Sequence, residues 1–137
     1  MSVTTVVVGY DGSAASDRAA RRAFDVVDGG GRVVLVTASP TLSAGLTRES
    51  LLDSPSRSER DEILSRGQEL IRQLAMEARL VASDGEPAAA IAETAAAEAA
   101  DLIIVGATGT GYVARAILGS TPAAILRLAP CDVLVVR

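Results

Sequence analysis

A glycine-rich turn late in the chain carries the clearest chemical signal in this sequence. The stretch from Gly106 to Thr121, GATGTGYVARAILGST, directly follows the apolar run DLIIV. Glycine has no Cβ, so the backbone amides of such a turn can come close to a ligand. Where the turn joins a strand to a helix, those amides form a site for an anion, most often a phosphate. The residue types therefore predict a phosphorylated ligand here.

Two common phosphate-binding patterns do not fit this turn. A P-loop needs Lys and then Ser or Thr after its second glycine, whereas Gly111 is followed by Tyr112 and Val113. The stretch from Gly109 to Ala114 satisfies G-x-G-x-x-A, but that dinucleotide pattern belongs after the first strand of a βαβ unit, with an acidic residue closing the next strand. Here the next strand is the last, and its acid, Asp132, stands at the wrong end.

A third spacing fits in full. The pattern G-x2-G-x9-G-[S/T] is formed by Gly106, Gly109, Gly119 and Ser120. Pro122 suits the first position of the helix that follows, and Ser120 or Thr121 suits its N-cap. The free amides and the helix dipole there would favour an anion by about 0.3 to 2 kcal/mol. Two groups of amides on one loop suit a chain of phosphates, although the glycines could also serve only to close a tight turn.

The elements that must position this turn alternate along the chain. Short runs of Val, Ile and Leu predict five strands, at residues 4–10, 32–38, 79–83, 101–107 and 131–137. Helical spacing predicts helices over residues 13–27, 61–78, 87–100 and 122–129. The alternation predicts an α/β fold: an open five-stranded parallel sheet with helices on both faces, within a single domain spanning residues 1–137.

The strand order then decides where a ligand can bind. With the order 3-2-1-4-5, the crevice lies at the carboxyl ends of the first and fourth strands. The turn from Asp11 to Ser13 would meet the glycine-rich turn there, and Ser13 would cap the first helix. Residues 39–60 are expected to form a long loop, with a short helical turn around Leu51 and Leu52.

Composition removes several classes of function. The net charge of −4 argues against a nucleic-acid partner. The chain has no His, which excludes Ser-His-Asp catalysis and leaves nothing that resembles a zinc site. Cys131 is the single cysteine and is expected to be a small buried residue. No apolar run approaches the roughly 18 residues of a membrane span, so we expect a cytoplasmic protein without a membrane partner.

The chain resembles the universal stress protein family (UspA-like domain), in its nucleotide-binding branch. The resemblance rests on the glycine pattern and on the segments VVVGYDGS, GEPAAAI, ADLIIVGATG, ILGS and APCDVLVVR, and it covers essentially the whole length. It implies a Rossmann-like fold of the adenine nucleotide alpha hydrolase-like kind. It also implies ATP as the ligand, with or without Mg²⁺, and cyclic AMP as the less expected one.

By position, the resemblance assigns seven residues to a nucleotide site and none to catalysis or to a metal. Asp11 would face the nucleoside, although it could equally be a turn residue that bonds to its own backbone. Ala38 would line the adenine. The phosphates would be held by Gly106, Gly109, Gly119, Ser120 and Thr121. Thr108 departs from the family, in which many members carry His before the second glycine.

Several functions remain open at this stage. The first expectation is an ATP-binding regulatory module in the stress response, with at most slow hydrolysis. The alternatives are a slow Mg-dependent ATP hydrolase organised by Asp11, a cyclic AMP binder, and a dimeric scaffold with a vestigial pocket. A homodimer is expected because the last strand, Cys131 to Arg137, lies at a sheet edge whose unpaired groups can pair with a second copy. The resemblance implies the same dimer.

Overall fold

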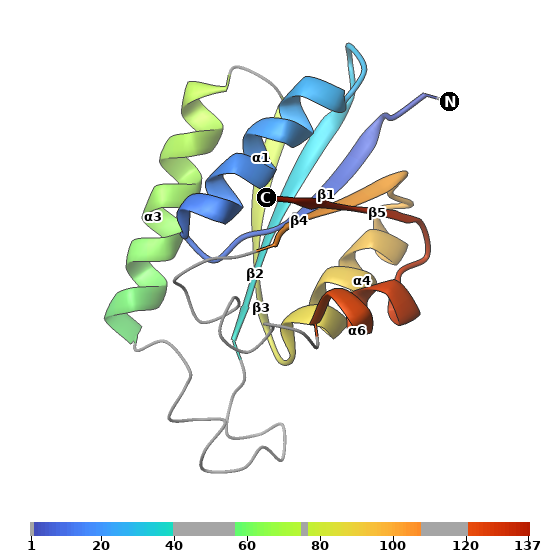
Figure 1. Cartoon of the computed structure of the whole chain (residues 1–137). Coiled ribbons are helices and arrows are strands. Elements are labelled where there is room, and N and C mark those ends of the chain that lie inside the picture. The colour runs from blue at the N-terminus through green and yellow to red at the C-terminus, as the bar shows by residue number, and fades with distance from the viewer. Residues whose placement is uncertain (1, 40–56, 75–76, 108–120) are drawn as a thin grey trace.

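Five parallel strands form the sheet at the centre of the molecule. The computed structural model describes residues 2–39, 57–74, 77–107 and 121–137. The strand order is β3-β2-β1-β4-β5 and neighbouring strands are parallel, so the predicted fold class and order are confirmed (Figure 1). The strands are β1 Thr5–Gly9, β2 Arg32–Ser39, β3 Glu77–Asp84, β4 Leu102–Gly106 and β5 Asp132–Val136.

Helices cover both faces of the sheet, as the alternation of elements predicts (Figure 1). One face is covered by α1 (Ala14–Val26) and α3 (Arg57–Gln73), and the other by α4 (Pro87–Ala97) and α6 (Thr121–Leu128). None of the helices formed by the described residues has the length and apolar character that crossing a membrane requires.

The central strand β1 contributes to both cores. Val6 and Val8 point into the core beneath α1 and α3, whereas Val7 points into the core beneath α4 and α6. None of the three has any solvent exposure. A strand buried on both faces has a continuous apolar sequence rather than an alternating one, and each buried Val contributes about 1.5 to 3 kcal/mol relative to an exposed one. The run VVV thus explains why β1 lies in the middle.

The boundary between α3 and β3 differs from the prediction. The helix predicted at 61–78 is α3, which spans Arg57–Gln73. The strand predicted at 79–83 is β3, which spans Glu77–Asp84 and pairs with β2 along its whole length. The helical prediction for Ala78 was wrong, because hydrogen bonds to a neighbouring strand outweigh helical spacing at the end of a helix.

The loop expected at 39–60 is shorter at both ends within the described part of the chain. Ser39 closes β2, and residues 57–60 form the first turn of α3. Both assignments differ from the prediction, which rested on the lack of a clear helical period. Residues 40–56, including the turn expected at Leu51 and Leu52, lie outside the described residues.

The helix α4 ends at Ala97, three residues before the predicted end, because Ala99 has a left-handed backbone with φ of 52°. The N–H of Ala100 donates to the carbonyl of Ala95 at 2.9 Å, and the N–H of Ala99 donates to the carbonyl of Ala96 at 3.2 Å. These are the two hydrogen bonds of a Schellman motif, in which Gly is the usual left-handed residue. A residue with a Cβ costs about 1 to 2 kcal/mol in that conformation.

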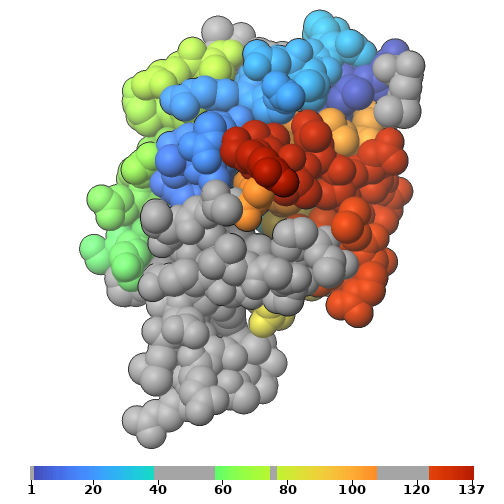
Figure 2. Space-filling view, in the orientation of Figure 1, coloured from blue at the N-terminus to red at the C-terminus, as the bar shows by residue number. Residues whose placement is uncertain are grey.

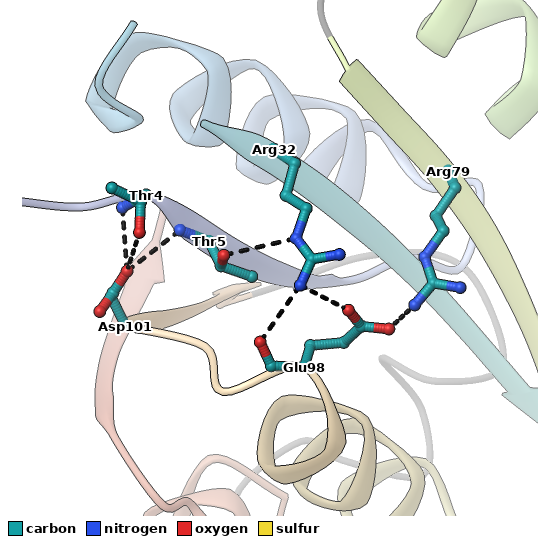
Figure 3. A network of polar contacts seen from close by, with 6 residues as sticks. All are labelled: Thr4, Thr5, Arg32, Arg79, Glu98 and Asp101. Carbon is teal, nitrogen blue, oxygen red and sulfur yellow. Dashed lines mark hydrogen bonds and ion pairs between the residues drawn. The ribbon is translucent and has the colours of Figure 1, made fainter. Parts of the chain in front are cut away.

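A set of polar residues joins the strands at the amino end of the sheet, opposite the predicted site (Figure 3). Asp101 Oδ2 accepts hydrogen bonds from the backbone N–H groups of Thr4 at 2.9 Å and Thr5 at 3.1 Å, and from the Thr4 hydroxyl at 2.9 Å. These hydrogen bonds stabilise the charged carboxylate, and the one from the Thr4 amide has the largest effect. They hold the pKa of the Asp101 carboxyl below its usual range. The start of β1 is thus tied to the residue before β4.

The other half of this arrangement is centred on Glu98. Arg32 Nη2 lies 2.9 Å from the Glu98 carboxylate and donates to the Glu98 carbonyl at 3.3 Å. Arg79 forms a second ion pair with the same carboxylate. We call the six residues Thr4, Thr5, Arg32, Arg79, Glu98 and Asp101 the amino-end network (Figure 3). It connects β1, β2 and β3 to the segment between α4 and β4.

Replacing Ala99 by Gly should raise the free energy of unfolding by about 1 kcal/mol, because Gly adopts the left-handed backbone without steric strain. Urea denaturation measures the change. Ala96→Gly is the matched control: Ala96 is an exposed, helical residue in the last turn of the same helix, and Gly there should lower the free energy by about 0.5 to 1 kcal/mol. A loss of stability in both variants would contradict the role given to Ala99.

Candidate functional site

The turn between β1 and α1 is closed by its own side chains. Asp11 is buried, and its Oδ1 accepts a hydrogen bond from the backbone N–H of Ser13 at 2.9 Å. Gly12 has a φ of 78°, which favours glycine. Ser13 is the N-cap of α1, as predicted, and its Oγ accepts from the N–H of Ser16 at 3.1 Å. The turn role considered for Asp11 is therefore present, while its contact with a nucleoside stays a prediction.

The end of β4 lies directly against the first turn of α1. A Cβ on Gly106 would stand 2.8 Å from the Cβ of Ala15 and 2.9 Å from its carbonyl carbon. Cβ atoms do not approach other atoms so closely, so this packing itself requires a glycine. The end of β4 therefore lies against the start of α1, whereas the glycine-rich turn after β4 lies mostly outside the described residues. The contact predicted between Gly106 and a phosphate stays a prediction, and it would use the backbone.

A pocket of about 290 Å³ opens at the carboxyl ends of β2 and β3. Its walls come from the ends of these two strands and from the first turns of α3. The lining residues are Thr37, Ala38, Arg60, Asp61, Leu64, Ala82, Ser83 and Asp84. Pockets of roughly 300 Å³ and above commonly hold small molecules. Ala38, one of the predicted site residues, is buried in this wall.

The polar groups around the pocket offer both hydrogen-bond donors and acceptors. The Arg60 guanidinium can donate, the carboxylates of Asp61 and Asp84 can accept, and the Ser83 hydroxyl can do both. Sequence reasoning missed these residues. The rule that ligands bind at the carboxyl ends of strands could have found Ser83 and Asp84, which end the strand next to β2. Arg60 had been placed in a loop, so nothing in its local sequence pointed to the pocket.

The predicted phosphate half of the site lies mostly outside the described residues. Gly109, Gly119 and Ser120 fall there, whereas Thr121 is the first residue of α6. The structure brings Asp11, Ala38 and Gly106 to one edge of the sheet, at or just beyond the carboxyl ends of β1, β2 and β4, three strands that lie side by side. Within the described ranges, no cluster of three His, Cys, Asp or Glu side chains could hold a metal ion.

A second hollow, of about 180 Å³, lies between α1 and α3 beside the same turn. There the Tyr10 hydroxyl donates to Asp17 Oδ1 at 2.8 Å, and Arg66 Nη2 lies 2.8 Å from Asp17 Oδ2. Burial, followed by the hydrogen bond to Asp17, raises the pKa of Tyr10 to about 12. The phenol therefore keeps its proton, and remains a donor, at neutral pH.

The open parallel sheet and the pocket at its carboxyl edge define a protein of the doubly wound α/β class. The sequence model of the Universal stress protein family matches residues 2–137. This chain therefore belongs to the universal stress protein family, and the resemblance seen in its sequence is confirmed.

Individual relatives match along nearly the whole chain. A member of the family in Staphylococcus haemolyticus is 35% identical over 144 residues, covering 100% of this chain and 86% of the relative. A universal stress protein of Mycobacterium tuberculosis is 31% identical over 141 residues, covering 97% of this chain and 95% of the relative. The crystal structure of a universal stress protein in complex with cAMP has a TM-score of 0.74 and 28% identity, covering 100% of this chain and 99% of that chain.

Replacing Gly106 by Ala should lower the free energy of unfolding by about 1 to 3 kcal/mol, because the new methyl group collides with the backbone of α1. Gly29→Ala is the control, since a Cβ there meets nothing within 4 Å, and its effect should stay within about 0.5 kcal/mol. Urea denaturation of both variants tests this. Equal stability of the two would show that β4 does not pack on α1 as described.

Proposed function

We propose that this protein binds an adenine nucleotide at the carboxyl edge of its sheet. The observation that carries the proposal is the pocket at the ends of β2 and β3, which has Ala38 in its wall and lies at the same edge as the contact between Gly106 of β4 and Ala15 of α1. A family member 28% identical over the whole of this chain is known in complex with cAMP, itself an adenine nucleotide.

The pocket suits the base. A purine presents ring nitrogens that accept hydrogen bonds, and adenine adds an amino group that donates them. Arg60 can donate to the ring nitrogens, while the carboxylates of Asp61 and Asp84 can accept from the amino group. The small side chain of Ala38 leaves room for a flat ring against β2. These features support placing the adenine at this position.

The ribose and the phosphates would extend from the pocket towards β1 and β4. Asp11 begins the turn after β1, where a carboxylate oxygen could meet a ribose hydroxyl. The phosphates would lie on the glycine pattern of Gly106, Gly109, Gly119 and Ser120, with Thr121 at the start of α6. The positive end of a helix dipole favours negative charge. This arrangement favours ATP over cyclic AMP, because a chain of phosphates would use the whole pattern.

The role that we propose is a regulatory module, active in the cytoplasm, that reports adenine nucleotide levels during stress. Binding without rapid turnover fits a chain that has no His and no P-loop lysine. Slow Mg-dependent hydrolysis is the rival function. The most direct test is mass spectrometry of the ligand released from freshly purified protein, followed by an assay of Mg-ATP hydrolysis. A turnover near one per second that is lost in Asp11→Ala would establish the rival, since typical enzymes turn over about ten times per second.

Replacing Gly109 by Val should weaken ATP binding at least tenfold, or by about 1.4 kcal/mol, because the side chain blocks the approach of the phosphates to the backbone. Isothermal titration calorimetry measures the affinity. Gly29→Val carries the same change at a position where a Cβ meets nothing within 4 Å, and should bind as the wild type does. Unchanged affinity in a folded Gly109→Val protein would remove the glycine pattern from the site.

We also propose that two copies pair through β5. This strand lies at the end of the strand order, and its residues lie on the face of the molecule seen in Figure 2. The Val136 carbonyl accepts from the N–H of Ala107, so the polar groups of Val136 face β4. Backbone N–H and C=O groups alternate in direction from one residue of a strand to the next. Those of Val135 therefore point away from β4, towards the open edge of the sheet. The Val135 side chain is also 39% exposed. An antiparallel partner strand would form hydrogen bonds with the outward polar groups of Val135 and cover its side chain.

Val135→Pro should convert the dimer into a monomer, because Pro removes the outward N–H donor while leaving the hydrogen bonds to β4 intact. Val135→Thr is the control, since Thr keeps both the donor and the branched shape. Sedimentation velocity at high micromolar concentration gives the assembly state of each protein. A wild-type protein that sediments as a monomer under these conditions would rule out the pairing.

A further inference from the structure

The pocket lined by Ala38 has walls of two kinds: the ends of two strands and the first turns of a helix. The ends of β2 and β3 are held by a continuous ladder of backbone pairing, from Arg32 opposite Glu77 to Ser39 opposite Asp84. The wall formed by α3 has no such ladder, because a helix reaches a sheet only through side chains. The width of the pocket therefore depends on how firmly the first half of α3 is seated.

The helix α3 packs on the sheet through Leu70, which is buried in the core, and it approaches the turn after β1 closely at two further points. A Cβ on Gly12 would lie 3.2 Å from Ile63 Cγ1, and a Cβ on Gly67 would lie 3.4 Å from Tyr10 Cε1. Ile63 and Gly67 are four residues apart, so they lie on the same face of the helix. Arg60, Asp61 and Leu64 line the pocket from the same stretch of α3. The residues that seat the helix thus interleave with those that line the pocket.

A polar bridge links the residue after β1, the helix α1 and the helix α3. Asp17 of α1 accepts from the Tyr10 hydroxyl through Oδ1 and pairs with Arg66 of α3 through Oδ2, both at 2.8 Å. Tyr10 is 1% exposed, so its hydroxyl depends on this partner, whereas the side chain of Arg66 is 55% exposed. An exposed ion pair contributes little to global stability. Its effect on the position of α3 can still be large, because it acts where the helix meets the turn.

We propose that Asp17 is a positioning residue for the nucleotide site. By joining Tyr10, the residue before Asp11, to Arg66 of α3, it holds the first half of that helix at the distance that the bound base requires. The inference rests on the proposed function, since it assumes that the pocket walled by α3 receives the adenine. Occupancy of the pocket would then depend on a bridge whose own atoms do not touch the ligand.

The test uses Asp17→Asn, which keeps an acceptor for Tyr10 but loses the charge that pairs with Arg66, and Tyr10→Phe, which removes only the hydroxyl. Each should weaken binding of a fluorescent ATP analogue, mant-ATP, by about threefold to tenfold, the effect of one such hydrogen bond. Each should also speed amide hydrogen exchange in residues 57–66 without changing it in α4. The control is Arg72→Gln, which breaks the exposed pair of Arg72 with Glu69 within α3 and should leave both readouts unchanged.

The outcomes separate this inference from the proposed function. If the wild type binds mant-ATP and both variants bind it equally well, Asp17 does not position the site. If the wild type binds no adenine nucleotide, the proposed function fails. Unchanged exchange at residues 57–66 in Asp17→Asn would overturn the bridge in either case. A purely structural role would lower the unfolding midpoint of the variants and leave the affinity of the folded protein as it was.

Discussion

The structure depends on the complete burial of β1. Its three valines fill cores on opposite faces of the sheet, and its backbone pairs with β2 on one side and β4 on the other. A strand buried in this way needs a covering layer on each face and a neighbouring strand at each edge. Those requirements impose the alternation of strands and helices on the rest of the chain. They also determine that Tyr10 and Asp11 emerge at the edge where the candidate site lies.

The elements around that edge differ in how they are held. Backbone ladders hold β2, β1 and β4 relative to one another, and the contact of Gly106 with Ala15 brings the end of β4 onto α1. By contrast, α3 is held through side chains: Leu70 in the core, the close packing at Gly12 and Gly67, and the bridge through Asp17. The strand side of the pocket is therefore fixed by backbone pairing, whereas the position of the α3 side depends on particular side chains. Substitutions in α3 are the simplest way to change the shape of the pocket without changing the fold.

The sheet order and most element positions could be predicted from the sequence, because runs such as VVV and LIIV have few other ways to be buried. The α3–β3 boundary could not, since Ala78 fits a helical face as well as a strand and only pairing with β2 decides between them. The end of α4 was missed because Ala99 adopts a backbone that its side chain disfavours. The strand order predicted that Asp11, Ala38 and Gly106 lie at the carboxyl edge of the sheet, where the structure places them. Arg60 was placed in the preceding loop, and Asp61 was assigned to the helix but not to a site, because no local pattern marked either residue as part of a pocket.

The amino-end network lies at the opposite end of the sheet from the candidate site (Figure 3). Its members come from five separate places in the chain, and Glu98 serves both Arg32 and Arg79. The loss of Glu98 would therefore remove both ion pairs at once. None of the six members of the network is among the residues proposed to meet the nucleotide. Substitutions at the carboxyl edge can therefore alter the candidate site while the contacts that hold the start of the sheet stay in place.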